Sequence, residues 1–231
     1  MLLRCLTEEI SLIAAIVPAH NEEDQILTCL AALRVAARDL GLESEQTMLV
    51  VALDACRDNT RNLAQQMGVT TIALSARNVG AARAVGAELA LAAGARWLAF
   101  TDADTQVAPD WISAQLALKS DAVCGSVAGR NWGNLSDTIR RQDAATYNDA
   151  QGNRQVYGAN FGISARAYDR AGGFKGLEGG DEAALVKALQ ASGASIAWSD
   201  TPRVFSSARR VFRTPLAFRA TNRREQQPSH A

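Results

Sequence analysis

Two aspartates, Asp102 and Asp104, are separated by one residue and follow the apolar run "RWLAF" after a single threonine. An acid pair at the end of a buried strand offers hard oxygen ligands on a short turn, and Mg2+ and Mn2+ prefer such ligands. An ion held there could bridge the phosphates of a nucleoside diphosphate and neutralise it as a leaving group. Turn formation is the competing interpretation, because aspartate also caps helices and makes Asx turns.

Polar residues follow two earlier apolar runs in the same way. The run "LIAAIV" (12–17) is followed by "PAHNEE", and the run 47–54 ends in "LDACRDNT". In open sheets of parallel strands, ligands bind outside the carboxyl ends of the strands. The sequence therefore predicts a ligand site at one edge of a sheet, where these segments and the acid pair meet.

The elements that must position these residues alternate along the first half of the chain. Apolar runs predict strands at 12–17, 47–54, 69–74 and 96–100. Their nearly continuous apolar character suits strands that are covered on both faces. The segments between them predict helices, which together give an α/β fold with a mostly parallel central sheet flanked by helices on both faces.

The helix boundaries are suggested by capping residues. Asn21 is expected to cap the first helix, and Asp58 or Asn59 the second. The segment "NVGAARAVG" predicts a third helix, in which Gly80 and Gly86 permit close approach to the sheet.

The second half of the chain is less regular. It predicts a strand at 121–129, a helix around 136–149, an amphipathic helix that begins with the acids of "GGDEAALVKAL", and terminal strands up to about 207. Nothing indicates a linker, so residues 1–222 are expected to form one domain. Residues 223–231 are expected to be a frayed tail.

Composition excludes several classes of protein. The 231 residues contain 24 Lys+Arg and 24 Asp+Glu, so no overall charge favours nucleic acid. The four scattered cysteines and two histidines favour neither zinc binding nor a disulfide framework, and they suit a cytoplasmic protein. No apolar run is long enough to span a bilayer. The arginine-rich stretch 203–224 leaves open a peripheral association with the inner face of a membrane.

Six motifs in fixed order carry a resemblance to a known family. They are "IVPAHNEE", "LDACRDNT", "NVGAARAVG", "TDADTQVAPDW", "GANFGISARAYDRAGGF" and "GDEAALVKAL". Together they resemble the family 2 glycosyltransferases, which have the nucleotide-sugar-binding GT-A fold. The resemblance covers roughly residues 13–210, which is most of the chain.

The resemblance implies a donor site built from several segments. The loop after the first strand would hold the base and ribose, with Glu22 bonded to ribose hydroxyls. Asp54 would contact the base, although "DACRDNT" departs from the family's usual D-G-S. Arg83 would lie near the diphosphate or the acid pair. The implied donor-binding residues are Pro18, Ala19, His20, Glu22, Asp54, Arg83, Asp102, Ala103, Asn160, Arg209 and Arg210.

Alternative interpretations remain for several of these residues. Glu22 could simply be a first-turn helix acid, and Arg83 a surface arginine. The arginines Arg209 and Arg210 could bind phosphate through their guanidinium groups or anchor the chain to anionic lipid.

The resemblance also implies a base and a metal. Similar enzymes carry Glu-Asp at a helix N-terminus, with the Asp as the base in inverting members. Here the order is reversed, so Glu182 falls in the base's place, and Asp181 could serve instead. Helix capping is the alternative role for both. Asp104, with Asp102, would hold Mn2+ or Mg2+.

The predicted activity is sugar transfer from a UDP-, GDP- or dTDP-sugar to an acceptor hydroxyl, with inversion and dependence on a metal. The acceptor could be a small molecule or a lipid-linked glycan, and a homodimer is one possible assembly. The alternatives are a non-catalytic nucleotide-sugar-binding relative and a sugar nucleotidyltransferase. A dehydrogenase is disfavoured, because the first turn lacks G-x-G-x-x-G.

Overall fold

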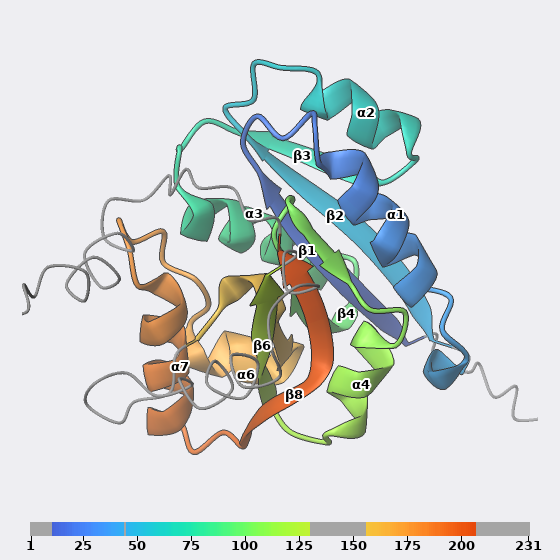
Figure 1. Cartoon of the computed structure of the whole chain (residues 1–231). Helices are drawn as coiled ribbons and strands as arrows, with labels where there is room; N and C mark the ends of the chain where they lie inside the picture. Colours follow the sequence, from blue (N-terminus) through green and yellow to red (C-terminus); the bar gives the residue numbers. More distant parts are fainter. Residues whose placement is uncertain (1–10, 44, 130–155, 207–231) are drawn as a thin grey trace, which may run out of the picture.

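A computed structural model describes residues 11–43, 45–129 and 156–206 (Figure 1). These residues form one curled sheet with the strand order β3-β2-β1-β4-β7-β6-β8-β5. The strands are β1 (Leu12–Ala19), β2 (Gln46–Asp54), β3 (Thr70–Leu74), β4 (Ala95–Phe100), β5 (Thr105–Val107), β6 (Ala122–Gly129), β7 (Phe161–Ser164) and β8 (Ile196–Ser206).

The strands predicted in the first half form the parallel part of the sheet. β1 lies between β2 and β4 and pairs parallel with both, and β2 pairs parallel with β3. Ile13 through Val17 are completely buried, as expected for a strand with helices on both faces. The four apolar runs are thus confirmed as strands, within one or two residues at each end.

The second half of the chain completes the sheet with mixed pairings. β7 is antiparallel to both β4 and β6, β8 is parallel to β6, and the short β5 is antiparallel to β8. Four of the seven pairings among the described strands are parallel, so the predicted, mostly parallel α/β sheet is confirmed. The predicted strand at 121–129 is β6.

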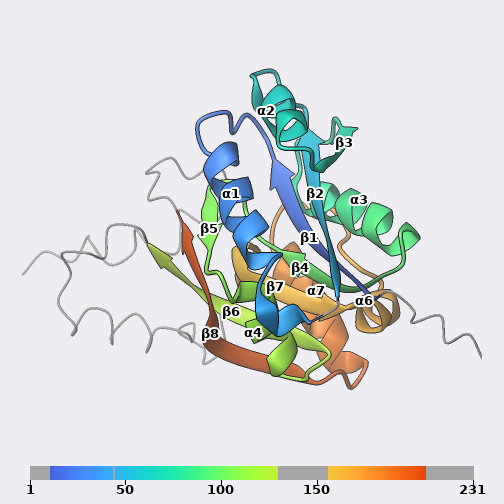
Figure 2. The ribbon, with the colours of Figure 1, turned by 90° about the vertical axis from the view of Figure 1, so that its right-hand side faces the viewer.

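Two hydrophobic cores lie on opposite faces of this sheet. Side chains alternate along β1, so that Ile13, Ala15 and Val17 belong to one core, and Ala14 and Ile16 belong to the other. Figure 2 shows α1 and α3 on opposite sides of β1 and β2. The helices are α1 (Ile26–Ala36), α2 (Thr60–Gln66), α3 (Val79–Ala92), α4 (Trp111–Ala117), α6 (Ala165–Ala171) and α7 (Asp181–Ala191), with short 3-10 turns at Leu40–Leu42 and Gly158–Asn160.

The first helix begins later than the sequence suggests. Asn21 was expected to cap it, but α1 starts at Ile26. Asn21 instead has a left-handed backbone, with φ 54°, and its Oδ1 accepts a hydrogen bond from the backbone N–H of Arg57. The side chain that could have capped the helix therefore joins the loop after β1 to the loop after β2.

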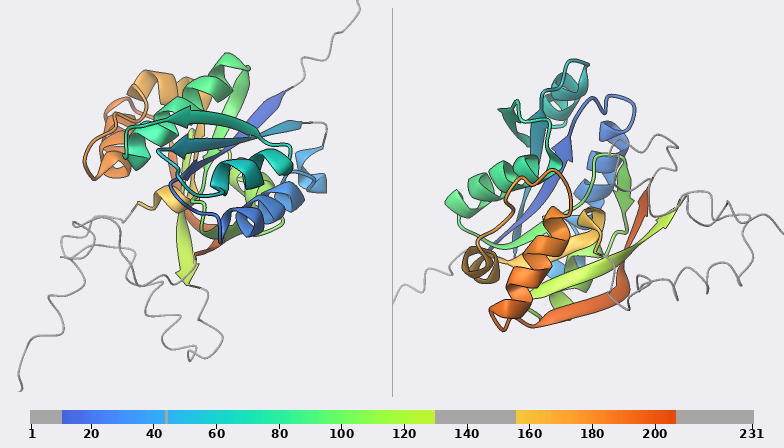
Figure 3. Two further views of the ribbon diagram at one scale, coloured as in Figure 1. Left: turned by 90° about the horizontal axis from the view of Figure 1, so that it is seen from above. Right: turned by 90° about the vertical axis from the view of Figure 1, so that its left-hand side faces the viewer.

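The third helix begins as predicted and lies close to the sheet. Asn78 caps α3, since its Oδ1 accepts a hydrogen bond from the N–H of Ala81 at 2.9 Å. A Cβ at Gly86 would lie 2.6 Å from the side chain of Ile16 in β1, so only glycine permits this approach. Figure 3 shows α3, α6 and α7 on the same side of the molecule, where α7 packs against α6.

Candidate active site

The ends of β1 and β2 lie side by side, as the parallel pairing requires. Ala19 pairs with Leu53, and the Nδ1–H of His20 donates to the backbone carbonyl of Asp54 at 2.6 Å. The backbone N–H of Glu22 donates to the hydroxyl of Thr60 at the start of α2. The polar segments after these two strands thus meet at one edge of the sheet.

Arg83 joins two segments that are far apart in the sequence. Its Nη2 donates to Oδ1 of Asp102 at 2.8 Å, and its Nη1 donates to Oε1 of Glu182 at 2.5 Å. Asp102 follows β4, and Glu182 stands in the first turn of α7. One guanidinium on α3 therefore links the predicted metal-binding turn to the predicted base.

The guanidinium of Arg83 is enclosed by protein. The residue is 2% exposed, its Cζ lies 5.7 Å from the ring centroid of Phe174, and a Cβ at Gly158 would lie 2.3 Å from its Nη2. Burial alone would lower the pKa of Arg83, but the carboxylates of Asp102 and Glu182 outweigh this effect and raise it. Arg83 is therefore a buried ion-pair partner and not a surface arginine.

Asp102 and Asp104 lie together on the turn between β4 and β5. The Asp102 side chain is 38% exposed although its Oδ1 is paired with Arg83, and the hydroxyl of Thr105 donates to Oδ1 of Asp104 at 3.3 Å. Desolvation raises the pKa of Asp102 above its ordinary value, while Arg83 acts in the opposite direction. Within the described part of the chain, no group of three or more His, Cys, Asp or Glu side chains is arranged to hold a metal.

The two acids at the start of α7 have different environments. The Glu182 side chain is 23% exposed and contacts Arg83. Asp181 is 3% exposed, and its two oxygens accept hydrogen bonds from the backbone N–H groups of Lys175 and Leu177. The carboxylate of Glu182 therefore faces the charged cluster, whereas that of Asp181 is occupied by backbone.

Asp54 is likewise occupied by backbone. Its Oδ1 accepts hydrogen bonds from the N–H groups of Ala76 and Arg77, and its Oδ2 accepts one from Asn78. The residue is 3% exposed. These bonds fix the loop that leads into α3, so the position of Asp54 gives it a structural task in addition to the predicted contact with a base.

Asn160 is completely buried and its side chain is fully bonded. Its Oδ1 accepts from the indole N–H of Trp111, and its Nδ2 donates to the carbonyls of Ser126 and Pro202, both at 2.7 Å. The amide thus ties α4, β6 and β8 together.

The remaining predicted residues divide into three groups. His20 and Glu22 are partly exposed at the edge of the sheet. Pro18, Ala19 and Ala103 are buried as whole residues, so little of their surface is open to a donor. Arg209 and Arg210, the predicted helix at 136–149 and the predicted tail 223–231 lie outside the described residues.

Sequence reasoning missed two neighbours of Arg83. Phe174 belongs to the "GGF" turn, to which no chemical role was assigned, yet its ring packs against the guanidinium. Gly158 opens the "GANFG" segment and leaves the room that the guanidinium needs. A glycine two residues before Asn160, a predicted donor-binding residue, was the available signal for such a close approach.

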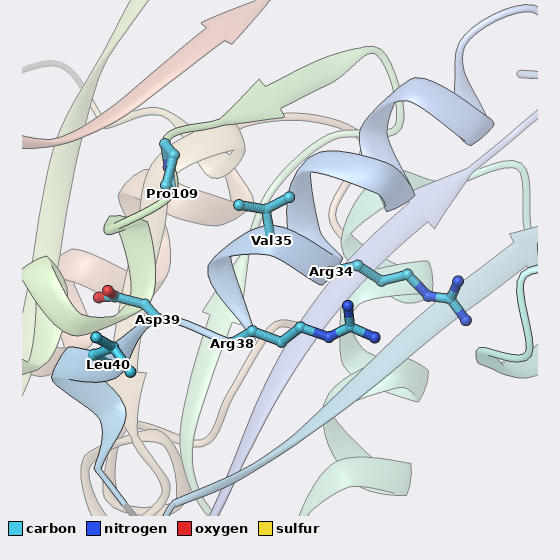
Figure 4. A pocket seen from close by; sticks show the side chains of 6 residues that line it. All are labelled: Arg34, Val35, Arg38, Asp39, Leu40 and Pro109. Atoms are coloured by element: carbon cyan, nitrogen blue, oxygen red, sulfur yellow. The ribbon is translucent and has the colours of Figure 1, made fainter.

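A surface hollow of about 340 Å³ lies elsewhere, beside the C-terminal end of α1. Figure 4 shows its lining residues, among them Arg34, Val35, Arg38 and Leu40. A second hollow shares the two arginines and borders the first residues of β1 and β2, at the opposite end of these strands from the acids. Neither hollow includes a residue of the predicted site. None of the described helices has the length and apolar character to cross a bilayer.

The sequence that forms this fold matches a known protein family. The model of the family described as "Glycosyl transferase family 2" matches residues 14–173. The chain therefore belongs to glycosyl transferase family 2. A comparison with curated proteins gives no match.

Solved structures of glycosyltransferases have the same fold. Staphylococcus aureus TarS 1–349 in complex with UDP-GlcNAc superposes with a TM-score of 0.65 at 16% identity, covering 87% of this chain and 59% of that one. The mannosyltransferase PcManGT from Pyrobaculum calidifontis, in complex with GDP-Man and Mn2+, also gives 0.65 at 16% identity, covering 90% and 59%. Glucosyl-3-phosphoglycerate synthase from Mycobacterium tuberculosis gives 0.61 at 15% identity, covering 87% and 73%. This chain thus spans about three fifths of the length of the first two.

Proposed function

We propose that this protein transfers a sugar from a nucleoside-diphosphate sugar to an acceptor hydroxyl, with inversion at the anomeric carbon. The observation that carries this proposal is the double ion pair of Arg83 with Asp102 and Glu182. This ion pair supports the proposal, because Glu182, to which we assign the role of base, lies next to the acid pair to which we assign a metal and a diphosphate. Donor activation and acceptor deprotonation require groups of these two kinds close together.

Mn2+ or Mg2+ is the metal that the acid pair would take. Asp104 is the principal ligand in this proposal, and Asp102, whose Oδ1 is held by Arg83, is the second. With their carboxylates ionised, Asp102, Asp104, Glu182 and Arg83 sum to a charge of −2, which a divalent cation would balance. When bound, the ion neutralises charge on the departing diphosphate. The structures of PcManGT and of the glucosyl-3-phosphoglycerate synthase both contain Mn2+.

Glu182 is the proposed general base. Arg83 holds its Oε1, so we expect the other oxygen, Oε2, to take the proton from the acceptor hydroxyl. Asp181 is less suited to this task, because backbone N–H groups occupy both of its carboxylate oxygens. Its burial also separates it from any acceptor in solution.

The donor would lie across the ends of β1, β2 and β4. We assign Glu22 and His20 to the ribose and base, because their side chains are partly exposed at this edge. Arg83 orients the carboxylates and does not bind the diphosphate directly, since its guanidinium is enclosed. Phosphate contacts are assigned to Arg209 and Arg210. The nucleotide could be UDP, GDP or dTDP, and the acceptor a small molecule or a lipid-linked glycan reached from the cytoplasm.

The experiment is a donor panel with a matched variant. Purified protein is incubated with Mn2+ or Mg2+, UDP-, GDP- and dTDP-sugars and a set of acceptors, and nucleotide release is measured. We expect one donor class to be turned over, and Glu182→Gln to lower kcat by about 100-fold or more while nucleotide binding persists. Asp169→Asn, on the exposed face of α6, is the control. Thermal stabilisation by nucleotide without any turnover would instead indicate a non-catalytic binding protein.

A further inference from the structure

Asp181 binds the segment 175–177, which lies between the end of α6 and the start of α7. Its Oδ1 accepts a hydrogen bond from the N–H of Lys175 at 3.1 Å, and its Oδ2 accepts one from Leu177 at 2.8 Å. Asn78 holds the same segment from the other side, since its Nδ2 donates to the carbonyls of Gly176 and Leu177, both at 2.9 Å. Segment 175–177 is therefore fixed between the first turns of α7 and α3.

The first turn of α3 also contacts Asp181 directly. A Cβ at Gly80 would lie 1.7 Å from Oδ2 of Asp181 and 2.6 Å from its Cγ. Any other residue at position 80 would push this carboxylate away. Gly80 therefore provides the space into which Asp181 fits.

This contact lies next to the ion pair between the same two helices. Asp181 directly precedes Glu182 on α7, and Gly80 precedes Arg83 by three residues on α3, which places both on one side of that helix. The contact between Gly80 and Asp181 and the ion pair between Arg83 and Glu182 thus form two adjacent links between α3 and α7.

We propose that Asp181 is a positioning residue that acts through Glu182. By fitting against Gly80 and binding segment 175–177, it fixes the first turn of α7 relative to α3, so that the Glu182 carboxylate stays on Arg83. This inference rests on the proposed function, in which Glu182 is the base. It assigns the two adjacent acids different tasks and gives Gly80 a role in the site.

The substitution Asp181→Asn tests this role with a small change of shape. An amide can accept one of the two backbone hydrogen bonds, but its NH2 group would face the second N–H, and that bond would be lost. We expect kcat to fall by about 10- to 100-fold through misplacement of Glu182. Binding of UDP, GDP or dTDP in the presence of Mn2+, measured by calorimetry, should change by less than about 3-fold.

A double-mutant cycle separates positioning from a general loss of structure. If Asp181 acts through Glu182, the variant Asp181→Asn/Glu182→Gln should have the kcat of Glu182→Gln within about 3-fold. A further decrease of 10-fold or more in the double variant would overturn the inference. Asp169→Asn serves as the matched control for the change from carboxylate to amide.

Amide hydrogen exchange gives a readout that does not depend on activity. The N–H groups of Lys175 and Leu177 should exchange at least about 10-fold faster in Asp181→Asn and in Gly80→Ala than in the wild type, and at the wild-type rate in Glu182→Gln. Unchanged protection in Asp181→Asn would contradict the proposed contact. If the wild type turns over no donor, the proposed function fails, whereas faster exchange would still support the link between α3 and α7.

Discussion

Two aspartates, Asp54 at the end of β2 and Asp102 just after β4, give the same signal in the sequence but have different environments. Asp54 is 3% exposed and accepts hydrogen bonds from three backbone N–H groups. The Asp102 side chain is 38% exposed and pairs with one guanidinium. The chain that follows explains the difference, because residues 76–78 fold back onto Asp54, while the turn after Asp102 leaves it accessible. An acid at a strand end is thus available for chemistry only where backbone does not use it.

The adjacent acids of α7 repeat this contrast. Backbone N–H groups occupy Asp181, and a charged side chain meets Glu182. In each pair of acids, Asp54 with Asp102 and Asp181 with Glu182, the acid that binds backbone N–H groups holds the start of a helix that carries a residue of the site. Asp54 fixes the entry to α3, and Asp181 fixes the entry to α7.

The largest effect is expected for Arg83→Met, which removes the cation shared by the two accessible acids. Asp102 and Glu182 would then lose the cation that both contact, and their like charges would repel each other. We expect a loss of about 3 kcal/mol in the free energy of unfolding and loss of turnover by more than about 100-fold. Urea unfolding and the nucleotide-release assay measure the two effects. Stability within about 0.5 kcal/mol of the wild type would contradict the buried ion pair.

The next largest effect is a difference in stability between variants of the two strand-end acids, Asp54 and Asp102. Asp54→Asn removes a carboxylate that accepts three backbone N–H groups, so the free energy of unfolding should fall by about 1–3 kcal/mol. Asp102→Asn should cost less, about 1 kcal/mol, because Arg83 keeps its bond to Glu182. Urea unfolding of both variants under one set of conditions makes the comparison. Equal costs, or the reverse order, would remove the distinction drawn between these aspartates.

The smallest effect concerns a surface ion pair, which serves as a reference for the buried one. Arg96 and Ser11 donate to Glu45, and they lower its pKa from 4.5 against the opposing effect of desolvation. A carboxyl with a lowered folded-state pKa stabilises the protein above its unfolded pKa. This contribution is lost as the pH falls through the folded value. Glu45→Gln should therefore cost up to about 1 kcal/mol in the free energy of unfolding at pH 7, and the cost should shrink as the pH falls through the lowered folded-state pKa of Glu45.

Much of the fold could be predicted, because continuous apolar runs determine β1 to β4 locally. The position of β7 between β4 and β6 could not, since antiparallel pairing between residues 37 to 67 positions apart leaves no periodic signal in the sequence. The three-residue strand β5 exists only through its pairing with β8. Asn21 was assigned to the wrong partner because its side chain can bond a neighbouring loop as readily as a helix end.

The candidate site was predictable in its residue types but not in its pairings. Motif order identified Arg83, Asp102 and Glu182, whereas their contacts join positions up to 99 residues apart. The backbone bonds to Asp54 and Asp181 depend on loop conformations that residue types alone do not define. Residue type also did not reveal that Asn160 and Ala103, both predicted to bind the donor, are buried.

The central claim is that the acid pair and Glu182 serve one reaction from opposite sides of Arg83. The most direct test measures nucleotide binding and turnover together in Asp104→Ala and Glu182→Gln, with Mn2+ and the donor that the wild type uses. We predict that Asp104→Ala loses Mn2+-dependent nucleotide binding, whereas Glu182→Gln keeps that binding and loses turnover. Full sugar transfer by Glu182→Gln, or Mn2+-dependent binding that survives in Asp104→Ala, would contradict this account.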